Sequence, residues 1–127
     1  MLETFASGFL VFAYLATALF QLAIVFGAPL GEYAFGGQTI GVLPVRLRVA
    51  SAISTLMLLV FAGHYLAQLN VLTRLLPDDQ NAISNWVMVG FNLLAAVMNN
   101  ITKSQKEKQL WGSTTIAMLV ASVVVAL

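Results

Sequence analysis

The chain has 127 residues, of which 60% are hydrophobic and only 9% are charged, and its net charge is +1. A soluble domain carries about 25% charged residues and a disordered chain needs high charge and low hydrophobicity, so this composition argues against both classes. The small net charge gives no basic surface for nucleic acid, and a chain with no cysteine and one histidine cannot build disulfides, thiolate sites or a two-histidine metal site. We therefore expect no nucleic acid partner, no metal and no cofactor.

Four long stretches between the few charges contain no ionised side chain. A membrane helix needs about 20 mostly apolar residues to cross a hydrocarbon core of about 30 Å. Segments of suitable length and composition cover roughly residues 5–27, 48–69, 84–101 and 110–127. The sequence therefore predicts an all-α fold, an integral membrane four-helix bundle, in which residues 1–127 form a single transmembrane domain.

The first expected helix, over residues 5–27, carries a polar stripe. Ser7, Tyr14 and Gln21 recur at intervals of seven residues, which is close to two helical turns and places them on one side. An amide cannot face lipid cheaply. We therefore expect Gln21 to point into the bundle or across an oligomer interface.

The connection over residues 27–44 is rich in glycine and proline, with five of the nine glycines and two of the three prolines. It is nevertheless apolar, and Tyr33 and Phe35 are typical of the headgroup region of a membrane. Irregular backbone at membrane depth is tolerated only against protein or a wet cavity. Two interpretations stay open: a lid-like or re-entrant segment that folds back over the bundle, or a loop packed on the headgroups.

Arg46 and Arg48 flank the expected start of the second helix. In the plainer interpretation they contact lipid phosphates, at about 1 kcal/mol each near an anionic leaflet. In the sharper one they form an anion clamp, with Glu32 pairing with either arginine. The clamp would be completed by amides expected at the same membrane face, namely Gln21, Asn99 and Asn100.

His64, in the second helix, is the only side chain in the expected spans that titrates near neutral pH. It is a candidate pH sensor, proton relay or haem ligand, although a haem held by two histidines would need a second chain. The plainer interpretation is an interfacial histidine hydrogen-bonded to Gln68, four residues further along the same helix.

The third helix repeats the seven-residue spacing with Asn85, Asn92 and Asn99. Amides in membrane helices commonly join helices through hydrogen bonds worth about 0.6–2 kcal/mol each. Three asparagines on one face exceed what such contacts need. A solvated or ligand-binding cavity along this stripe therefore remains open beside the purely structural role.

The basic residues predict the orientation of the chain. Five lie in connections one and three, against Arg74 alone in connection two; the five are Arg46, Arg48, Lys103, Lys106 and Lys108. Because basic loops stay in the cytoplasm, connections one and three should be cytoplasmic and both termini outside. Glu107, within the third connection, is expected in a simple solvated turn.

Three short segments carry a resemblance to a known group of proteins. They are the stretch Gly27-Ala28-Pro29-Leu30-Gly31, the stretch Gly36-Gly37-Gln38, and Leu43-Pro44-Val45-Arg46-Leu47-Arg48-Val49-Ala50-Ser51. This pattern resembles that of small four-helix bacterial inner-membrane proteins of unassigned function. The resemblance covers about 25 residues and the hydropathy profile. It implies a bacterial plasma-membrane protein, and it carries no activity and no catalytic residue.

The functional expectation follows from what the spans contain, which is amides, hydroxyls and one histidine rather than carboxylates or catalytic motifs. The leading hypothesis is a non-enzymatic membrane subunit or binding protein that acts through its polar interhelical faces. Its partners would be membrane lipid and either further copies of itself or a larger membrane complex. The alternative is a small-solute channel or carrier working as a homo-oligomer, with Arg46 and Arg48 at its inner mouth. A lipid-modifying enzyme is the third class.

Overall fold

The structure is a computed structural model that describes residues 1–127, and it contains only helices and connections. The elements are α1 (Leu2–Val25), α2 (Val45–Gln68), α3 (Asp78–Ile101), α4 (Gln105–Glu107), a π-helical turn η3 (Lys108–Gly112) and α5 (Ser113–Ala126). Because α4, η3 and α5 run on as one rod, four helices are long and apolar enough to cross a membrane. The expected all-α architecture with four such helices is confirmed.

The third and fourth helices begin earlier than the ranges 84–101 and 110–127. Helix α3 begins directly after Pro77, and the carboxylates of Asp78 and Asp79 lie in its first turn, where the helix dipole stabilises negative charge. Helix α4 begins after Ser104, whose Oγ accepts a hydrogen bond from the Glu107 N–H at 3.1 Å. Hydropathy alone cannot detect these polar first turns.

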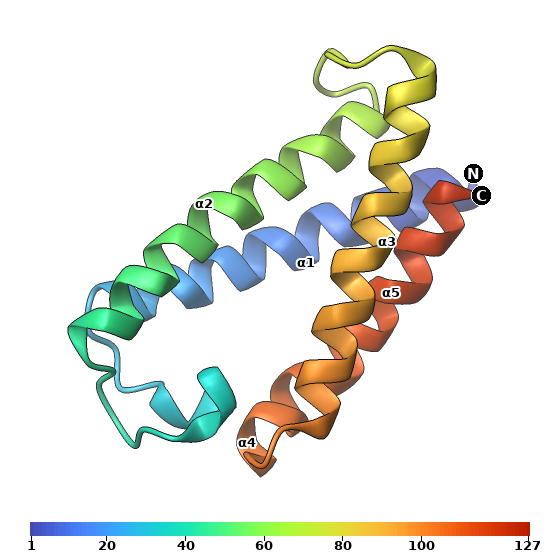
Figure 1. Cartoon of the computed structure of the whole chain (residues 1–127). Coiled ribbons are helices and arrows are strands. Elements are labelled where there is room, and N and C mark those ends of the chain that lie inside the picture. Colours follow the sequence, from blue (N-terminus) through green and yellow to red (C-terminus); the bar gives the residue numbers. More distant parts are fainter.

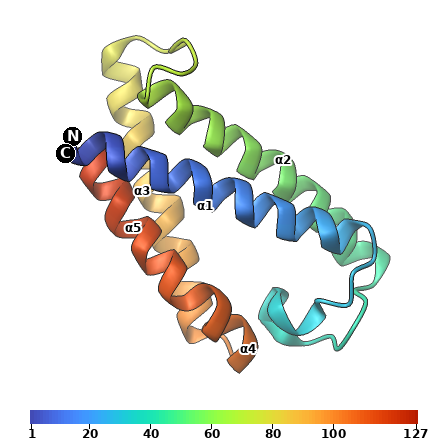
Figure 2. The same ribbon diagram turned by 180° about the vertical axis from the view of Figure 1, so that it is seen from behind.

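The helices form two hairpins that meet at one end and diverge at the other. Helix α1 packs along α2, α3 packs along α5, and α1 also packs against α5. The hairpins converge at the end where both termini lie and splay toward the end that holds the α1–α2 connection and α4 (Figures 1 and 2). We call these the terminal end and the loop end. Helices α2 and α3 come close only near the connection that joins them at the terminal end.

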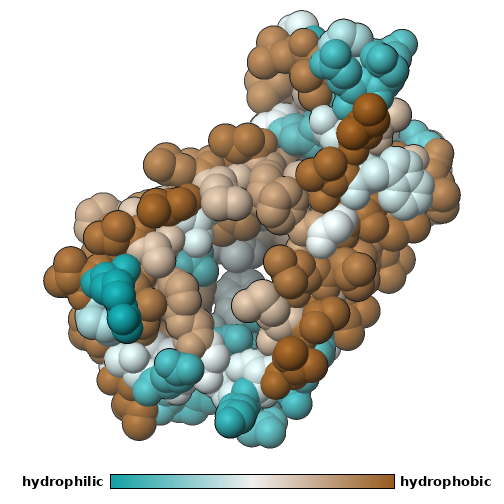
Figure 3. Space-filling model, viewed as in Figure 1, coloured by the Kyte–Doolittle hydropathy of each residue, from teal (hydrophilic) through white to brown (hydrophobic).

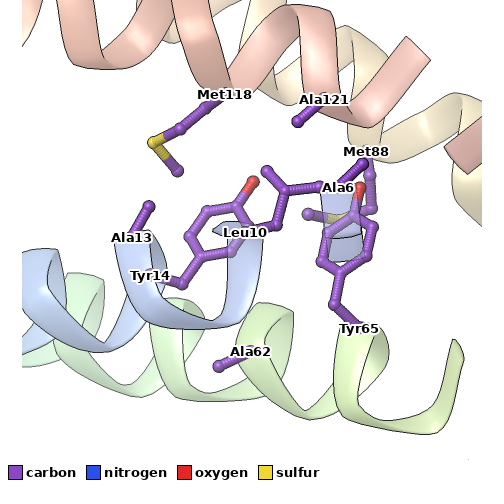
Figure 4. Close-up of a cluster of buried hydrophobic side chains, with 9 residues drawn as sticks. All are labelled: Ala6, Leu10, Ala13, Tyr14, Ala62, Tyr65, Met88, Met118 and Ala121. Atoms are coloured by element: carbon purple, nitrogen blue, oxygen red, sulfur yellow. The ribbon is translucent and has the colours of Figure 1, made fainter. Parts of the chain in front are cut away.

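The main core lies where the hairpins converge. Small side chains from α1, α2 and α5 let the helices approach closely, which is how membrane helices pack in the absence of a hydrophobic driving force. Tyr14 packs edge-on against Phe61 at a centroid distance of 5.6 Å and stacks with Tyr65 at 6.0 Å. Figure 4 shows the buried members of this core: Ala6, Leu10, Ala13, Tyr14, Ala62, Tyr65, Met88, Met118 and Ala121.

The α1–α2 connection is an ordered segment that packs against the loop end of α1. It contains two short 3-10 turns, η1 (Gly31–Tyr33) and η2 (Phe35–Gly37), and the Gly31 N–H donates to the Gly41 carbonyl at 2.9 Å. Glycine is required at position 31, because a Cβ there would meet the carbonyl oxygens of Thr39 and Gly41. The segment buries its own small apolar cluster: Ile24 from α1, with Ala34 and Leu43.

Candidate functional site

The divergence of the two hairpins leaves a cavity of about 720 Å³ at the loop end. Ligand cavities in proteins typically measure about 300–1,000 Å³. The space-filling view shows the hollow between α2 and α3, with mostly apolar side chains along its two sides and hydrophilic ones at its lower end (Figure 3). Residues 33–36 and Gln38 of the α1–α2 connection line its loop end. The cavity therefore opens between α2 and α3, and a segment of the first connection covers one end.

One wall of the cavity carries amides from α1 and α3. The Tyr14 hydroxyl donates to Asn92 Oδ1 at 2.9 Å, and Asn92 Nδ2 donates to the Met88 carbonyl at 2.9 Å. Asn99 uses its Nδ2 in the same way on the Ala95 carbonyl, which leaves its Oδ1 for a ligand. Gln21 Oε1 is buried without a hydrogen-bond partner. Unlike Asn92, the Gln21 and Asn99 side chains thus keep hydrogen-bonding capacity that the protein does not use.

Much of the remaining lining of the cavity is aromatic and aliphatic. Phe20 from α1 and Trp111 from η3 stand edge to face with ring centroids 4.9 Å apart, and Phe61 and Phe91 lie 5.1 Å apart. Methionines 98 and 118 complete this lining, together with leucines of α2 and α3. Methionine adapts its shape to irregular ligands, and aromatic rings supply large contact areas. A cavity lined by both amides and aromatic rings suits a molecule that is itself amphipathic.

Glu107 closes the loop end of the cavity, and its position differs from the solvated turn expected from the sequence. The residue is only 6% exposed, lines the cavity, and accepts a hydrogen bond from the Gly36 N–H at 2.9 Å through Oε2. Sequence reasoning missed it because three lysines surround it. The signal that could have found it is Ser104-x-x-Glu107, the pattern of a helix start, which places Glu107 on the fourth helix rather than in a loop.

The covering segment is fastened to the third connection by polar contacts. The Ser104 hydroxyl donates to the Glu32 carbonyl oxygen at 2.5 Å, and the Glu32 carboxylate forms an ion pair with Lys106. The Lys106 ammonium also lies over the Tyr33 ring, 5.7 Å from its centroid. Together with the Glu107–Gly36 hydrogen bond, these contacts hold the segment in a lid-like position across the end of the cavity.

The expected anion clamp is not formed. Arg46 is exposed, and Arg48 donates twice to the Val25 carbonyl, at 2.8 and 3.1 Å, so that it caps the end of α1. Glu32 pairs with Lys106 instead of either arginine. Asn100 donates to the Ala96 and Gly112 carbonyls and ties α3 to the π-helical turn. Of the predicted site residues, the structure brings three together in the cavity, namely Gln21, Asn92 and Asn99.

His64 lies at the terminal end, away from the cavity. Its Nε2 is 2.7 Å from Asn85 Oδ1, and its ring packs edge-on against Tyr65 at 5.0 Å. Gln68 binds His64 only through the backbone: Gln68 Nε2 donates to the His64 carbonyl at 3.3 Å, while the Gln68 side chain pairs with Asn81 through two hydrogen bonds of 2.8 and 3.0 Å. A haem held by two histidines would still need a second chain, since His64 is the only histidine.

The cavity combines several kinds of chemical group. It offers hydrogen-bonding amides and hydroxyls, aromatic surface, and one buried carboxylate, without a nucleophile hydrogen-bonded to a base. Asn92 and its hydrogen-bond partner Tyr14 line the deep end of the cavity, and the lid-like segment covers the other end. No protein-family model, no curated protein and no solved structure matches the chain.

Proposed function

We propose that this chain is a non-enzymatic membrane binding protein that holds one small amphipathic molecule in the cavity between its hairpins. The observation that carries the proposal is the mixed lining of this cavity. The amides of Gln21 and Asn99 line it together with aromatic rings and methionines, and Asn99 Oδ1 has no hydrogen-bond partner in the protein. The opening between α2 and α3 gives a bilayer-dissolved molecule direct access (Figure 3).

The setting we propose is a bacterial plasma membrane, with connections one and three in the cytoplasm and both termini outside. The five-to-one distribution of basic residues supports this orientation. It would place the lid-like segment, Lys103 and Lys106 at the cytoplasmic face. Membrane lipid and further copies of the chain, or a larger membrane complex, would cover the exposed apolar surfaces of α2 and α3.

Fluorescence of Trp111 provides the test, because this side chain lines the cavity whereas Trp86 does not. In a Trp86→Phe background, a chain-brominated fatty alcohol should quench Trp111 with a saturable curve. Asn99→Leu and Gln21→Leu should each weaken binding by about threefold to tenfold, the effect of losing one hydrogen bond. The control Gln109→Leu, at an exposed position outside the cavity, should bind as the parent does. Quenching that stays linear in probe concentration, or that ignores both amide substitutions, would contradict the proposal.

A second candidate, a carrier or channel for a small solute, has one observation in its favour. A polar cavity of about 250 Å³ at the terminal end is lined by Ser7 and Asn85 among others. Two helical turns, about 10 Å, separate these residues from Tyr14 and Asn92 of the main cavity, and Leu10 and Met88 lie between them. Replacing both Leu10 and Met88 by Ala should then let glycerol cross proteoliposomes faster than wild type, whereas Phe12→Ala on the outer surface should not. Equal glycerol fluxes would argue against a path.

A further inference from the structure

The carboxylate of Glu107 is buried at the loop end of the cavity without a cationic partner. Its one side-chain hydrogen bond comes from the Gly36 N–H at 2.9 Å, and the only salt bridge in the structure joins Lys106 to Glu32. A buried charge is unfavourable unless it is paired, and carboxylates within membrane helices usually mark the position of a ligand or ion. Oxygen Oε1 of Glu107 accepts no hydrogen bond from the protein. The Glu107 carboxylate therefore has one oxygen without a hydrogen-bond donor and no cation to balance its charge.

The nearby lysines do not supply the missing charge. Lys103 lines the cavity, but its side chain is exposed and makes no ion pair with Glu107. Lys106 is bound to Glu32 and faces the Tyr33 ring. Lys108 follows Glu107 in the chain and makes no ion pair either. No lysine of the protein thus forms an ion pair with Glu107, so a cation that enters the cavity could bind this carboxylate.

Aromatic side chains surround the same end of the cavity. Phe20, Tyr33, Phe35 and Trp111 all line it together with Glu107. The faces of aromatic rings attract cations, and rings placed around a carboxylate are a common way to bind an ammonium group. The π-helical turn that begins directly after Glu107 is a second sign, because such turns occur frequently at functional sites.

We propose that the cavity binds an amphipathic amine, with its ammonium group on Glu107 and its apolar part along the aromatic and methionine wall. The inference rests on the binding function proposed above and specifies the class of ligand. It also gives the carboxylate two tasks, since Oε2 holds the lid-like segment through Gly36 while Oε1 receives the ammonium. Binding of the ammonium group at Oε1 would thus leave the hydrogen bond from the Gly36 N–H to Oε2 in place, and the lid-like segment would stay fastened.

The test compares three chain-brominated probes of equal length, a primary amine, an alcohol and a carboxylic acid, on Trp111 fluorescence at neutral pH in the Trp86→Phe background. The amine should bind about tenfold more tightly than the alcohol, because a charge-assisted hydrogen bond is about twice as strong as a neutral one and adds an ionic attraction. The carboxylic acid should bind most weakly. Glu107→Gln should reduce the amine to the affinity of the alcohol and leave the alcohol unchanged.

The matched control is Glu3→Gln, which removes an acid at the terminal end and leaves both the cavity lining and the Lys106–Glu32 ion pair intact. It should retain the preference for the amine. Equal binding of amine and alcohol to the parent, or an unchanged preference in Glu107→Gln, would overturn the inference while leaving the binding function standing. If none of the three probes quenches Trp111 saturably, the binding function itself fails.

A measurement on the unsubstituted chain keeps the inference testable if Glu107→Gln does not fold. A hydrophobic carbodiimide modifies buried carboxyl groups, and mass spectrometry can assign the modification among the five acidic residues. Dodecyltrimethylammonium should protect Glu107 from modification, whereas dodecanol at the same concentration should not. Equal protection by both compounds, or none by the ammonium, would contradict the assignment of Glu107 as the cation site.

Discussion

The two ends of the bundle use the same residue types in opposite ways. At the terminal end the amides pair with one another or with His64: Gln68 with Asn81 at 2.8 and 3.0 Å, and Asn85 with His64 at 2.7 Å. At the loop end the Gln21 carbonyl oxygen and Asn99 Oδ1 have no protein partner. Along the asparagine stripe of α3, Asn85 therefore joins helices at the terminal end, where it also lines the smaller polar cavity, whereas Asn99 lines the main cavity without joining helices.

The separation of the hairpins explains this difference. At the terminal end, alanines 6, 62 and 121 let α1, α2 and α5 approach closely. At the loop end, Phe20 and Trp111 stand edge to face between the hairpins and the α1–α2 connection occupies the gap. Whether an amide in this fold is structural or available to a ligand is thus decided by the bulk of its neighbours rather than by its own helix.

The largest effect on the loop end should come from Gly31→Val. A side chain at this position meets the backbone oxygens of Thr39 and Gly41, which cannot rotate away, so overpacking should cost about 1–3 kcal/mol or more and displace the lid-like segment. Limited proteolysis should then cleave residues 27–44 rapidly. The control Gly8→Ala has open space around it and should change neither proteolysis nor melting by much. Full protection of the segment in Gly31→Val would contradict the role given to this glycine.

A second substitution acts at the boundary between the two ends. Asn92→Leu should lower stability by about 1–3 kcal/mol, because the buried Tyr14 hydroxyl loses its acceptor. Tyr14→Phe should cost less, about 0.5–1.5 kcal/mol, because it removes one hydrogen bond and leaves the bond from Asn92 Nδ2 to the Met88 carbonyl in place. Thermal melting in detergent, followed by circular dichroism, should rank the two variants in this order. The reverse order would contradict the role given to Asn92.

Much of this fold could be predicted from the sequence, because the signals are local. Charge-free segments of sufficient length define four helices, and the seven-residue spacing places Gln21, Asn92 and Asn99 on inward faces. The early starts of α3 and α4 could not be predicted from hydropathy, because polar first turns such as Asp78-Asp79 carry no hydropathy signal. Helix type and face were thus readable from residues close together in the chain.

The site was less predictable, because its contacts join residues far apart in the chain. Nothing local shows that Glu107 reaches Gly36, 71 positions earlier, or that Lys106 takes Glu32 from the arginines. The charge of Arg48 is compatible with a lipid-phosphate contact or an anion clamp, whereas in the structure a free carbonyl at the end of α1 binds its guanidinium. These contacts depend on how the two hairpins diverge, and the sequence of a single helix does not determine that divergence.

The comparison between the ends is tested most directly by a pair of glutamine substitutions. Gln68→Leu should destabilise the bundle by about 0.6–2 kcal/mol, because Asn81 loses both of its hydrogen bonds to the Gln68 side chain. Gln21→Leu should be neutral or slightly stabilising, because it removes a buried oxygen that has no partner. Melting of the two variants in one detergent gives the difference. Equal destabilisation would mean that Gln21 is also bonded within the protein and that the two ends do not differ.

The smallest effect should come from the ion pair that fastens the lid-like segment. Its size shows whether surface charge or buried hydrogen bonds hold that segment in place. Lys106 is exposed, so its attraction to Glu32 is weakened by water and screened by salt, with a Debye length of about 10 Å at 0.1 M. In an Ala34→Cys background, whose thiol lies buried in the segment, Lys106→Ala should raise the rate of modification by a water-soluble maleimide only slightly, and high salt should abolish the difference. Ser104→Ala should raise the rate more, because Ser104 binds the Glu32 carbonyl and also caps α4 in a site that salt does not screen. A larger effect from Lys106 than from Ser104 would mean that surface charge, rather than buried hydrogen bonds, keeps the cavity covered.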